Sequence, residues 1–229
     1  MTNCHCRAWT ARGTRGSTSG LMMPALTFAS CYVYSPTGAS AVCRRSRLLC
    51  ALLKAGDSGF LLKYAMRVRQ QVAEQAPLAG YFSPSAVLIP VPGSLPQVPE
   101  LTNAASHLAH ALLEAGLGLD IWSGLRRVQA VPKSATAAPG ARPTVAHHYD
   151  SFAVEAARPP REVLLVDDIV TKGRTLLAAA ARVQEAFPRA HIRAFALLRT
   201  MGFAAGVNRL LEPCVGEIKW RADDARRSP

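Results

Sequence analysis

One segment, residues 163–175 (Val-Leu-Leu-Val-Asp-Asp-Ile-Val-Thr-Lys-Gly-Arg-Thr), constrains the fold more than any other part of the chain. Its first four apolar residues predict a strand buried on both faces of a parallel sheet, and Asp167 and Asp168 follow directly. At the carboxyl end of such a strand, side chains reach the crevice where α/β proteins bind ligands. The segment therefore predicts an α/β domain with a ligand site at this strand end.

The two halves of this segment suit the two ends of a ribose 5-phosphate. Adjacent carboxylates accept hydrogen bonds from vicinal hydroxyls, or reach them through hydrated Mg²⁺, so Asp167 and Asp168 are assigned to the ribose hydroxyls and to magnesium. In the following loop a glycine allows close backbone approach, threonine hydroxyls donate, and the amides that open the next helix favour an anion. The residues expected to hold the 5-phosphate are Thr171, Lys172, Gly173, Arg174 and Thr175. We expect the loop amides to contribute more than the Lys172 side chain.

Two other classes of protein place Asp-Asp after an apolar strand, namely ATPases with a magnesium-binding strand and phosphorylation receiver domains. The chain lacks the Gly-x-x-x-x-Gly-Lys-[Ser/Thr] loop that an ATPase requires. Neither class calls for Thr-x-Gly-x-Thr directly after the acids. The ribose phosphate interpretation is therefore favoured.

Strand and helix patterns alternate along the chain. Apolar, β-branched runs predict strands at 26–34, 86–91, 163–166 and 191–198, with a shorter extended segment near 119–122. Helical spacing predicts helices at 46–54, 60–76, 101–115 and 176–187. Residues 129–150 show little periodicity and are expected to form a long loop. This order predicts a mainly parallel sheet flanked by helices.

Residues 163–175 resemble the 5-phosphoribosyl diphosphate signature of type I phosphoribosyltransferases. A looser similarity to the ComF-like branch covers about residues 26–215, and three stretches carry it: Leu-Lys-Ala-Gly-Asp (53–57), Ile-Pro-Val-Pro (89–92) and Leu-Arg-Arg-Val (125–128). ComF-like proteins also carry a Cys-x-x-Cys zinc module and an Arg-Gly-Phe-Asn-Gln stretch. This chain has neither, and Thr171 stands where purine-salvage members have an Asp.

The resemblance implies a type I phosphoribosyltransferase fold that transfers ribose 5-phosphate from 5-phosphoribosyl diphosphate and Mg²⁺ to a nucleophile. It places the diphosphate at the turn around Pro92, Gly93 and Ser94, which contains no cationic side chain. A loop over residues 133–148 is expected to supply that charge, with Lys133, Arg142, His147 or His148 as donors. Arg126 and Arg127 are read as surface or salt-bridge residues.

We expect residues 1–20 to be disordered or to precede the true start, 21–84 to form an amino-terminal hood, 85–215 the phosphoribosyltransferase core, and 216–229 a tail. A hood is an accessory segment that covers the active site and selects the acceptor. Basic residues followed by an apolar stretch at 21–31 resemble an export signal, but a sugar-diphosphate enzyme belongs in the cytoplasm, which is the expected location.

The net charge of +12, from 27 Lys and Arg against 15 Asp and Glu, indicates a solvated basic surface, or a patch for nucleic acid. No apolar run is long enough to span a membrane. The six cysteines include no Cys-x-x-Cys pair, so free thiols are expected in place of a zinc site. The partners expected are 5-phosphoribosyl diphosphate, an unidentified acceptor and a second copy of the chain. A non-catalytic sugar-diphosphate sensor, or a module of DNA uptake or DNA metabolism, is the alternative function.

Overall fold

The structure is a computed structural model that describes most of the chain after residue 22. The described residues are 23–74, 77–96, 103–132, 142–155, 160–202, 207–221 and 224–229. The expectations for residues 1–20 and for Lys133 lie outside them.

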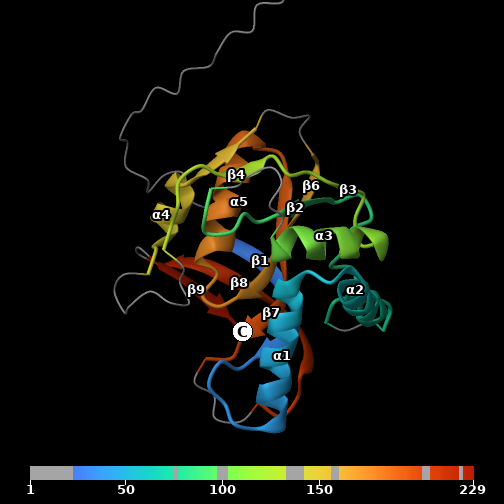
Figure 1. The fold of residues 1–229 in the computed structure, drawn as a ribbon. Coiled ribbons are helices and arrows are strands. Elements are labelled where there is room, and N and C mark those ends of the chain that lie inside the picture. Colours follow the sequence, from blue (N-terminus) through green and yellow to red (C-terminus); the bar gives the residue numbers. More distant parts are fainter. Residues whose placement is uncertain are drawn as a thin grey trace, which may run out of the picture.

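A seven-stranded sheet forms the centre of the molecule (Figure 1), in the order β3-β2-β6-β7-β1-β8-β9. The first five strands of this order run parallel, and β8 and β9 are antiparallel to their neighbours. The strands are β1 (Ala25–Tyr34), β2 (Val87–Pro90), β3 (Asp120–Ile121), β6 (Glu162–Val170), β7 (His191–Thr200), β8 (Leu211–Arg221) and β9 (Asp224–Ser228). The prediction of an α/β domain with a mainly parallel sheet is confirmed.

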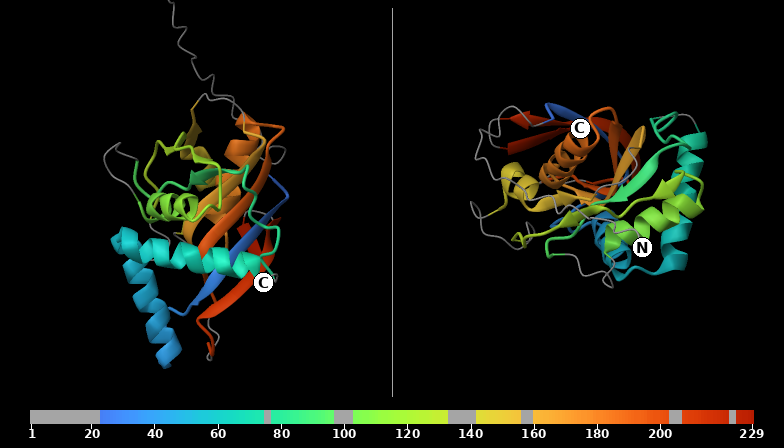
Figure 2. Two further views of the ribbon diagram at one scale, coloured as in Figure 1. Left: turned by 90° about the vertical axis from the view of Figure 1, so that its right-hand side faces the viewer. Right: turned by 90° about the horizontal axis from the view of Figure 1, so that it is seen from above.

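Helices cover both faces of this sheet (Figure 2). One face packs against α1 (Ala41–Ala55), α2 (Ser58–Ala73) and α3 (Ala104–Glu114). The other packs against α4 (Val145–Asp150), α5 (Arg174–Ala186) and the small hairpin of β4 (Leu125–Arg127) and β5 (Phe152–Val154). In β6, Leu164 and Val166 face the first layer, and Val163 and Leu165 face the second. The uninterrupted apolar run of β6 follows from this burial on both faces.

Helix α1 begins five residues before the start expected from periodicity. Ser40 caps it by accepting a hydrogen bond from the Cys43 amide, and Gly56 ends it with a φ of 74°. The first turn carries the exposed Arg44 and Arg45, so it shows no apolar spacing although it is helical. Helix α2 begins two residues before and ends three residues before the expected range 60–76, and α3 lies within the expected range 101–115 but is shorter.

The expectation that 129–150 is entirely a loop is wrong at its end, because residues 145–150 form α4. Thr144 caps this helix, and Val145 and Tyr149, four residues apart, are both buried. A helix of six residues depends on packing and not on propensity, and its single apolar pair gives almost no periodic signal.

The sheet crosses both domain boundaries drawn from the sequence. β1, placed in the hood segment 21–84, lies in the sheet between β7 and β8. β8 runs through residue 216, and β9 is formed by the tail. The amino-terminal segment therefore contributes a central strand, and the carboxyl-terminal residues extend the sheet.

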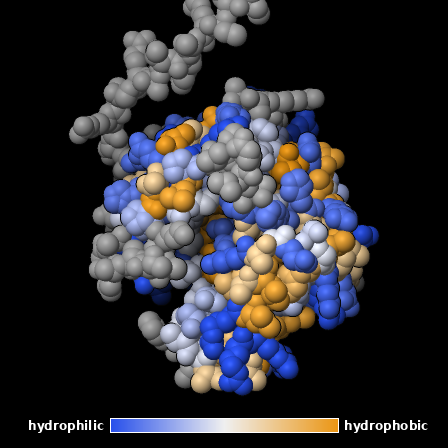
Figure 3. Space-filling view, viewed as in Figure 1, coloured by the Kyte–Doolittle hydropathy of each residue, from blue (hydrophilic) through white to orange (hydrophobic). Residues whose placement is uncertain are grey.

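The surface shown in Figure 3 mixes polar and apolar residues, with apolar side chains over α1 and α2. Among the most exposed of these are Leu48 and Met66, at 59% and 48%. Scattered apolar residues of this kind are usual on protein surfaces. Among the described residues, no helix is both long and apolar enough to cross a membrane.

Candidate functional site

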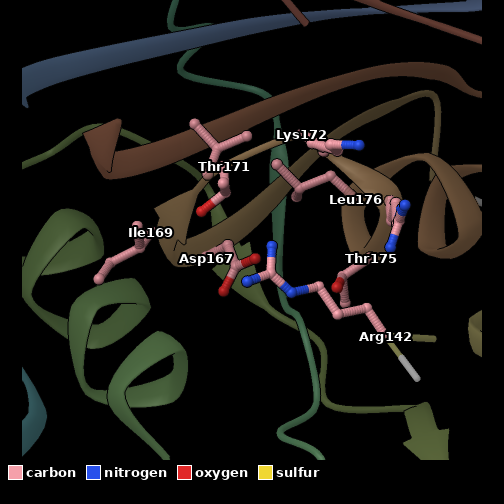
Figure 4. A pocket seen from close by; sticks show the side chains of 10 residues that line it. Arg142, Asp167, Ile169, Thr171, Lys172, Thr175 and Leu176 are labelled. Atoms are coloured by element: carbon pink, nitrogen blue, oxygen red, sulfur yellow. The ribbon is translucent and has the colours of Figure 1, made fainter. Parts of the chain in front are cut away.

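A cavity lies at the carboxyl end of β6, against the first turn of α5 (Figure 4). Its volume is about 130 Å³, enough for a few water molecules. A cavity of this size can hold a phosphate group but not a whole nucleotide. Its lining residues are Arg142, Asp167, Ile169, Val170, Thr171, Lys172, Gly173, Arg174, Thr175 and Leu176. The structure therefore brings Asp167 and the whole predicted phosphate loop to one cavity.

The two adjacent acids lie differently. Asp167 lines the cavity, and its carboxylate accepts a hydrogen bond of 2.8 Å from the Asp168 amide. The Asp168 carboxylate accepts from the Ile169 amide and does not line the cavity. The two carboxylates nevertheless interact with each other through their side chains, and only Asp167 reaches the cavity.

Asp167 is in an environment that disfavours its charge. Burial and then the neighbouring Asp168 raise its pKa well above the usual value, and the buried cation Arg127 opposes this shift. A cation bound beside Asp167 would stabilise the carboxylate and lower its pKa.

The side chains of the phosphate loop contact protein groups instead of projecting freely. Thr171 Oγ1 lies 2.9 Å from Thr200 Oγ1, and Thr175 Oγ1 lies 3.4 Å from His148 Nε2. Arg174 donates from Nη1 to the Pro143 carbonyl at 3.1 Å. The amides at the start of α5 have no acceptor within the helix, because the first turn of any helix leaves them unpaired. The backbone is therefore the main anion-binding element here.

Gly173 gives the loop its shape. It is the N-terminal cap residue of α5, with φ 86°, and it offers no side-chain cap. A Cβ at this position would lie 2.6 Å from Ile218 of β8. The loop therefore requires glycine both for its left-handed backbone and for its packing.

Asp224, at the start of β9, neutralises the cations of this loop. Its carboxylate accepts from Lys172 Nζ at 2.9 Å and from Arg174 through Nε and, at 2.8 Å, Nη2. The Arg174 and Lys172 hydrogen bonds hold the pKa of Asp224 well below its usual range. This contact ties the carboxyl-terminal hairpin to the loop.

The turn after β2 does not line the cavity but emerges beside it. Val91 donates from its amide to the Val166 carbonyl at 2.8 Å, so the turn leaves the sheet next to Asp167. The cation that the turn lacks in sequence comes from β4. Arg127, only 2% exposed, donates to the Gly93 carbonyl and lies under the turn.

The cations expected from residues 133–148 differ in their placement. Arg142 lines the cavity, and its side chain extends toward Asp167 in Figure 4. His147 is exposed and completes the cap of α4, with its Nδ1 accepting from the Thr144 amide at 3.4 Å. His148 is buried, and burial together with the charges of Arg127, Arg174 and His147 lowers its pKa to about 4. The structure thus brings Arg142 to the cavity and places His148 behind Thr175.

The donor set fits a magnesium ion that completes its shell with ligand oxygens and water. Among the described residues, no group of three or more His, Cys, Asp or Glu could hold a metal ion. Mg²⁺ is usually bound by one or two carboxylates plus substrate phosphates, and Asp167 supplies one. Magnesium binding would therefore depend on the phosphorylated ligand.

Sequence reasoning missed three residues of this region: Arg127, Ser151 and Asp224. The sequence suggests a surface or salt-bridge residue at Arg127, because β4 is only three residues long and its Arg-Arg pair shows no apolar–polar alternation, although burial alternates along the strand. Ser151 bonds to Arg127, and its position follows α4, which was not expected. Asp224 lies 50 residues from Arg174, and only the topology of β8 and β9 joins them.

No model of a known protein family matches this chain, and a search of the curated proteins found no match. The geometry of the site is therefore the main basis for its function.

Proposed function

We propose that the protein is a phosphoribosyltransferase of the type I fold, which transfers ribose 5-phosphate from 5-phosphoribosyl diphosphate to a nucleophile. One observation carries the proposal: Asp167 and the amide-rich loop 171–175 face a single phosphate-sized cavity at a parallel strand end. In this proposal Asp167 takes the ribose hydroxyls and the loop amides take the 5-phosphate. The fold class supports this function but is shared by many others.

In the proposed reaction the bond from the anomeric carbon to the diphosphate oxygen breaks, and a bond to the nucleophile forms. The diphosphate leaves with the bonding electron pair, and the nucleophile loses its proton to solvent. Asp167 binds the ribose hydroxyls and the loop amides hold the 5-phosphate, so that the anomeric carbon is held toward the turn at 92–94. Bound magnesium, held by Asp167 and the ligand, would neutralise the charge of the diphosphate.

Calorimetric titration of 5-phosphoribosyl diphosphate with Mg²⁺ tests the proposal. The wild type is expected to bind saturably, and Asp167→Asn to weaken binding about 100-fold, because it removes a charged hydrogen-bond partner. Asp168→Asn is expected to weaken it less, since Asp168 does not line the cavity. The exposed Asp150→Asn is the matched control. A folded wild type that does not bind would refute the proposal, whereas binding justifies an acceptor screen by diphosphate release.

A second candidate, a module that binds nucleic acid, is favoured by a basic groove beside the loop. This cavity of about 380 Å³ is lined by Thr171, Lys172, Arg221, Asp224, Ala225, Arg226 and Arg227. Asp224 is already paired, so the remaining arginines give the groove a net positive charge. Guanidinium groups along a hairpin can contact successive phosphates.

Titration of a fluorescent single-stranded oligonucleotide over a series of salt concentrations tests this candidate. Two or three phosphate contacts would give a log–log slope of roughly −1.5 to −2, and Arg226→Gln should reduce it by about one contact. Arg189→Gln, outside the groove, is the control. The groove would be excluded as a nucleic-acid site if the wild type does not bind the oligonucleotide at low salt, or if its affinity does not depend on salt. Equal changes of the slope in Arg226→Gln and Arg189→Gln would exclude it as well.

A further inference from the structure

The Arg127 guanidinium is buried without a carboxylate hydrogen bonded to it. Its side chain donates to the carbonyl of Gly93, to that of Pro92 at 3.5 Å, and to the Ser151 hydroxyl, and the guanidinium carbon lies 4.2 Å from the centre of the Phe152 ring. Within the described part of the chain it forms no salt bridge. Burial lowers its pKa to about 10, so it stays charged at neutral pH.

A buried cation of this kind is costly. Removing an ion from water costs several kcal/mol unless an opposite charge and good hydrogen bonds compensate. Here the hydrogen-bond acceptors are neutral, and the Asp167 charge acts on Arg127 without a hydrogen bond. No carboxylate is hydrogen bonded to the guanidinium, so the compensation is incomplete before a ligand binds. An anion bound at the turn would supply it.

The hydrogen bonds of the turn point its donors outward. Four consecutive carbonyls are taken by the protein: Val91 by Asn103 at 3.1 Å, Pro92 and Gly93 by Arg127, and Ser94 by the Val131 amide at 2.9 Å. The peptide bonds here are trans, so the N–H of each peptide points opposite to its carbonyl. The amides of Gly93 and Ser94 therefore point away from Arg127.

These two amides are open to a ligand. Within the described residues, neither donates a hydrogen bond, and Gly93 is exposed. A Cβ at Gly93 would meet no atom closer than 3.9 Å. Two successive outward amides with a buried positive charge behind them are donors suited to an anion.

We propose that Arg127 is a positioning residue for the diphosphate group of the ligand. It fixes the carbonyls of Pro92 and Gly93 inward, which presents the amides of Gly93 and Ser94, and its buried charge attracts the anion that they bind. The proposal rests on the proposed function for the identity of the ligand. It also explains how a turn without a cationic side chain serves a diphosphate.

Two ligands that differ only in the diphosphate separate this role from a general structural one. We would titrate 5-phosphoribosyl diphosphate and ribose 5-phosphate, each with Mg²⁺, into the wild type, Arg127→Met and Arg127→Lys. Arg127→Met should weaken the first ligand about 10- to 100-fold and leave the second within about twofold. Arg127→Lys keeps the positive charge but loses the planar guanidinium that donates to several acceptors at once, so the affinity for 5-phosphoribosyl diphosphate should fall by an intermediate amount.

The neighbour Arg126 offers a matched control, because it is exposed and pairs with Glu155 at 2.6 Å. Arg126→Met should bind both ligands as the wild type does. An Arg127→Met protein that is folded by circular dichroism and binds both ligands normally, or loses both equally, would overturn the proposal. If Arg127→Met does not fold, the ratio of the two affinities in Arg127→Lys decides, and an unchanged ratio overturns it.

Inorganic diphosphate with Mg²⁺ distinguishes failure of this proposal from failure of the proposed function. If the wild type binds neither sugar phosphate but binds diphosphate, and Arg127→Met does not, the proposed function fails and the role of Arg127 stands. If the wild type binds none of the three ligands, both fail.

Discussion

The two sides of the candidate site are built in opposite ways. On the side proposed to bind the 5-phosphate (the phosphate side), Asp167 and residues 171–175 lie close together in sequence, and the exposed or partly exposed cations Lys172 and Arg174 are paired with Asp224. On the side proposed to bind the diphosphate (the diphosphate side), the turn at 92–94 is held by Arg127, which is buried and bonded only to neutral acceptors.

This difference separates charges that serve the fold from charges available to a ligand. The loop cations pair with Asp224 and join the hairpin to α5, so the backbone amides are the donors left for the proposed phosphate. Arg127 has no such anionic partner bonded to it, and we propose that a ligand anion completes its environment. Each side can therefore be disturbed separately, and the expected effects differ in size.

Gly173→Ala should produce the largest effect, confined to the phosphate side. The substitution forces a left-handed backbone on alanine and places a Cβ 2.6 Å from Ile218. We expect the free energy of unfolding to fall by about 2–4 kcal/mol, and binding of ribose 5-phosphate to be lost. Chemical denaturation and calorimetry measure the two effects.

Gly80→Ala separates the backbone cost from the clash. Gly80 has a φ of 66°, and no atom lies within 4 Å of the position that a Cβ would take, so only the backbone cost of about 1 kcal/mol is expected. Equal losses of stability in both variants would show that the close packing of Gly173 against Ile218 of β8 does not contribute to the stability of the phosphate side.

The pH dependence of stability tests the environment of His148, which is buried near the charges of Arg127 and Arg174. The unfolded chain takes up a proton at this residue near pH 6.5, whereas the folded protein does so only near pH 4. Stability is therefore lost as the pH falls, by about 2 kcal/mol between pH 7 and pH 5. His148→Gln should remove this loss relative to the wild type, as measured by urea unfolding at the two pH values.

Asp167 contributes in the opposite direction, because its raised pKa makes stability fall as the pH rises. This contribution is the same in both proteins, so it cancels when the pH dependence of the unfolding free energy of His148→Gln is subtracted from that of the wild type. The exposed His147→Gln is the control and should retain the loss at pH 5. The same pH dependence in His148→Gln and the wild type would mean that the His148 ring is not kept neutral beside Arg127 and Arg174.

The contrast between the two sides also explains what could be predicted from the sequence. The strand end, Asp167 and the loop are local, so spacing alone places them at one cavity. Of the two acids that the sequence assigns to the ribose hydroxyls, only Asp167 lines the cavity. Arg127 and Asp224 reach the site through β4 and β9, short strands whose neighbours are set by tertiary pairing. No local pattern carries that information.

The smallest effect is expected for Asp224→Asn, which tests whether pairing with Asp224 prevents Lys172 and Arg174 from binding the ligand phosphate. The loss of stability should be about 1 kcal/mol or less, because Asp224 and Lys172 are partly exposed at 37% and 56%. Ribose 5-phosphate should bind roughly threefold more tightly at low salt, since an anion beside its phosphate is removed, and the gain should disappear at high salt. Glu217→Gln, which breaks the exposed pair with Lys219 on β8, should change neither quantity measurably. Weaker binding in Asp224→Asn would reverse the interpretation, because Asp224 would then orient Lys172 and Arg174 for the phosphate, and the phosphate side would depend on tertiary contacts as the diphosphate side does.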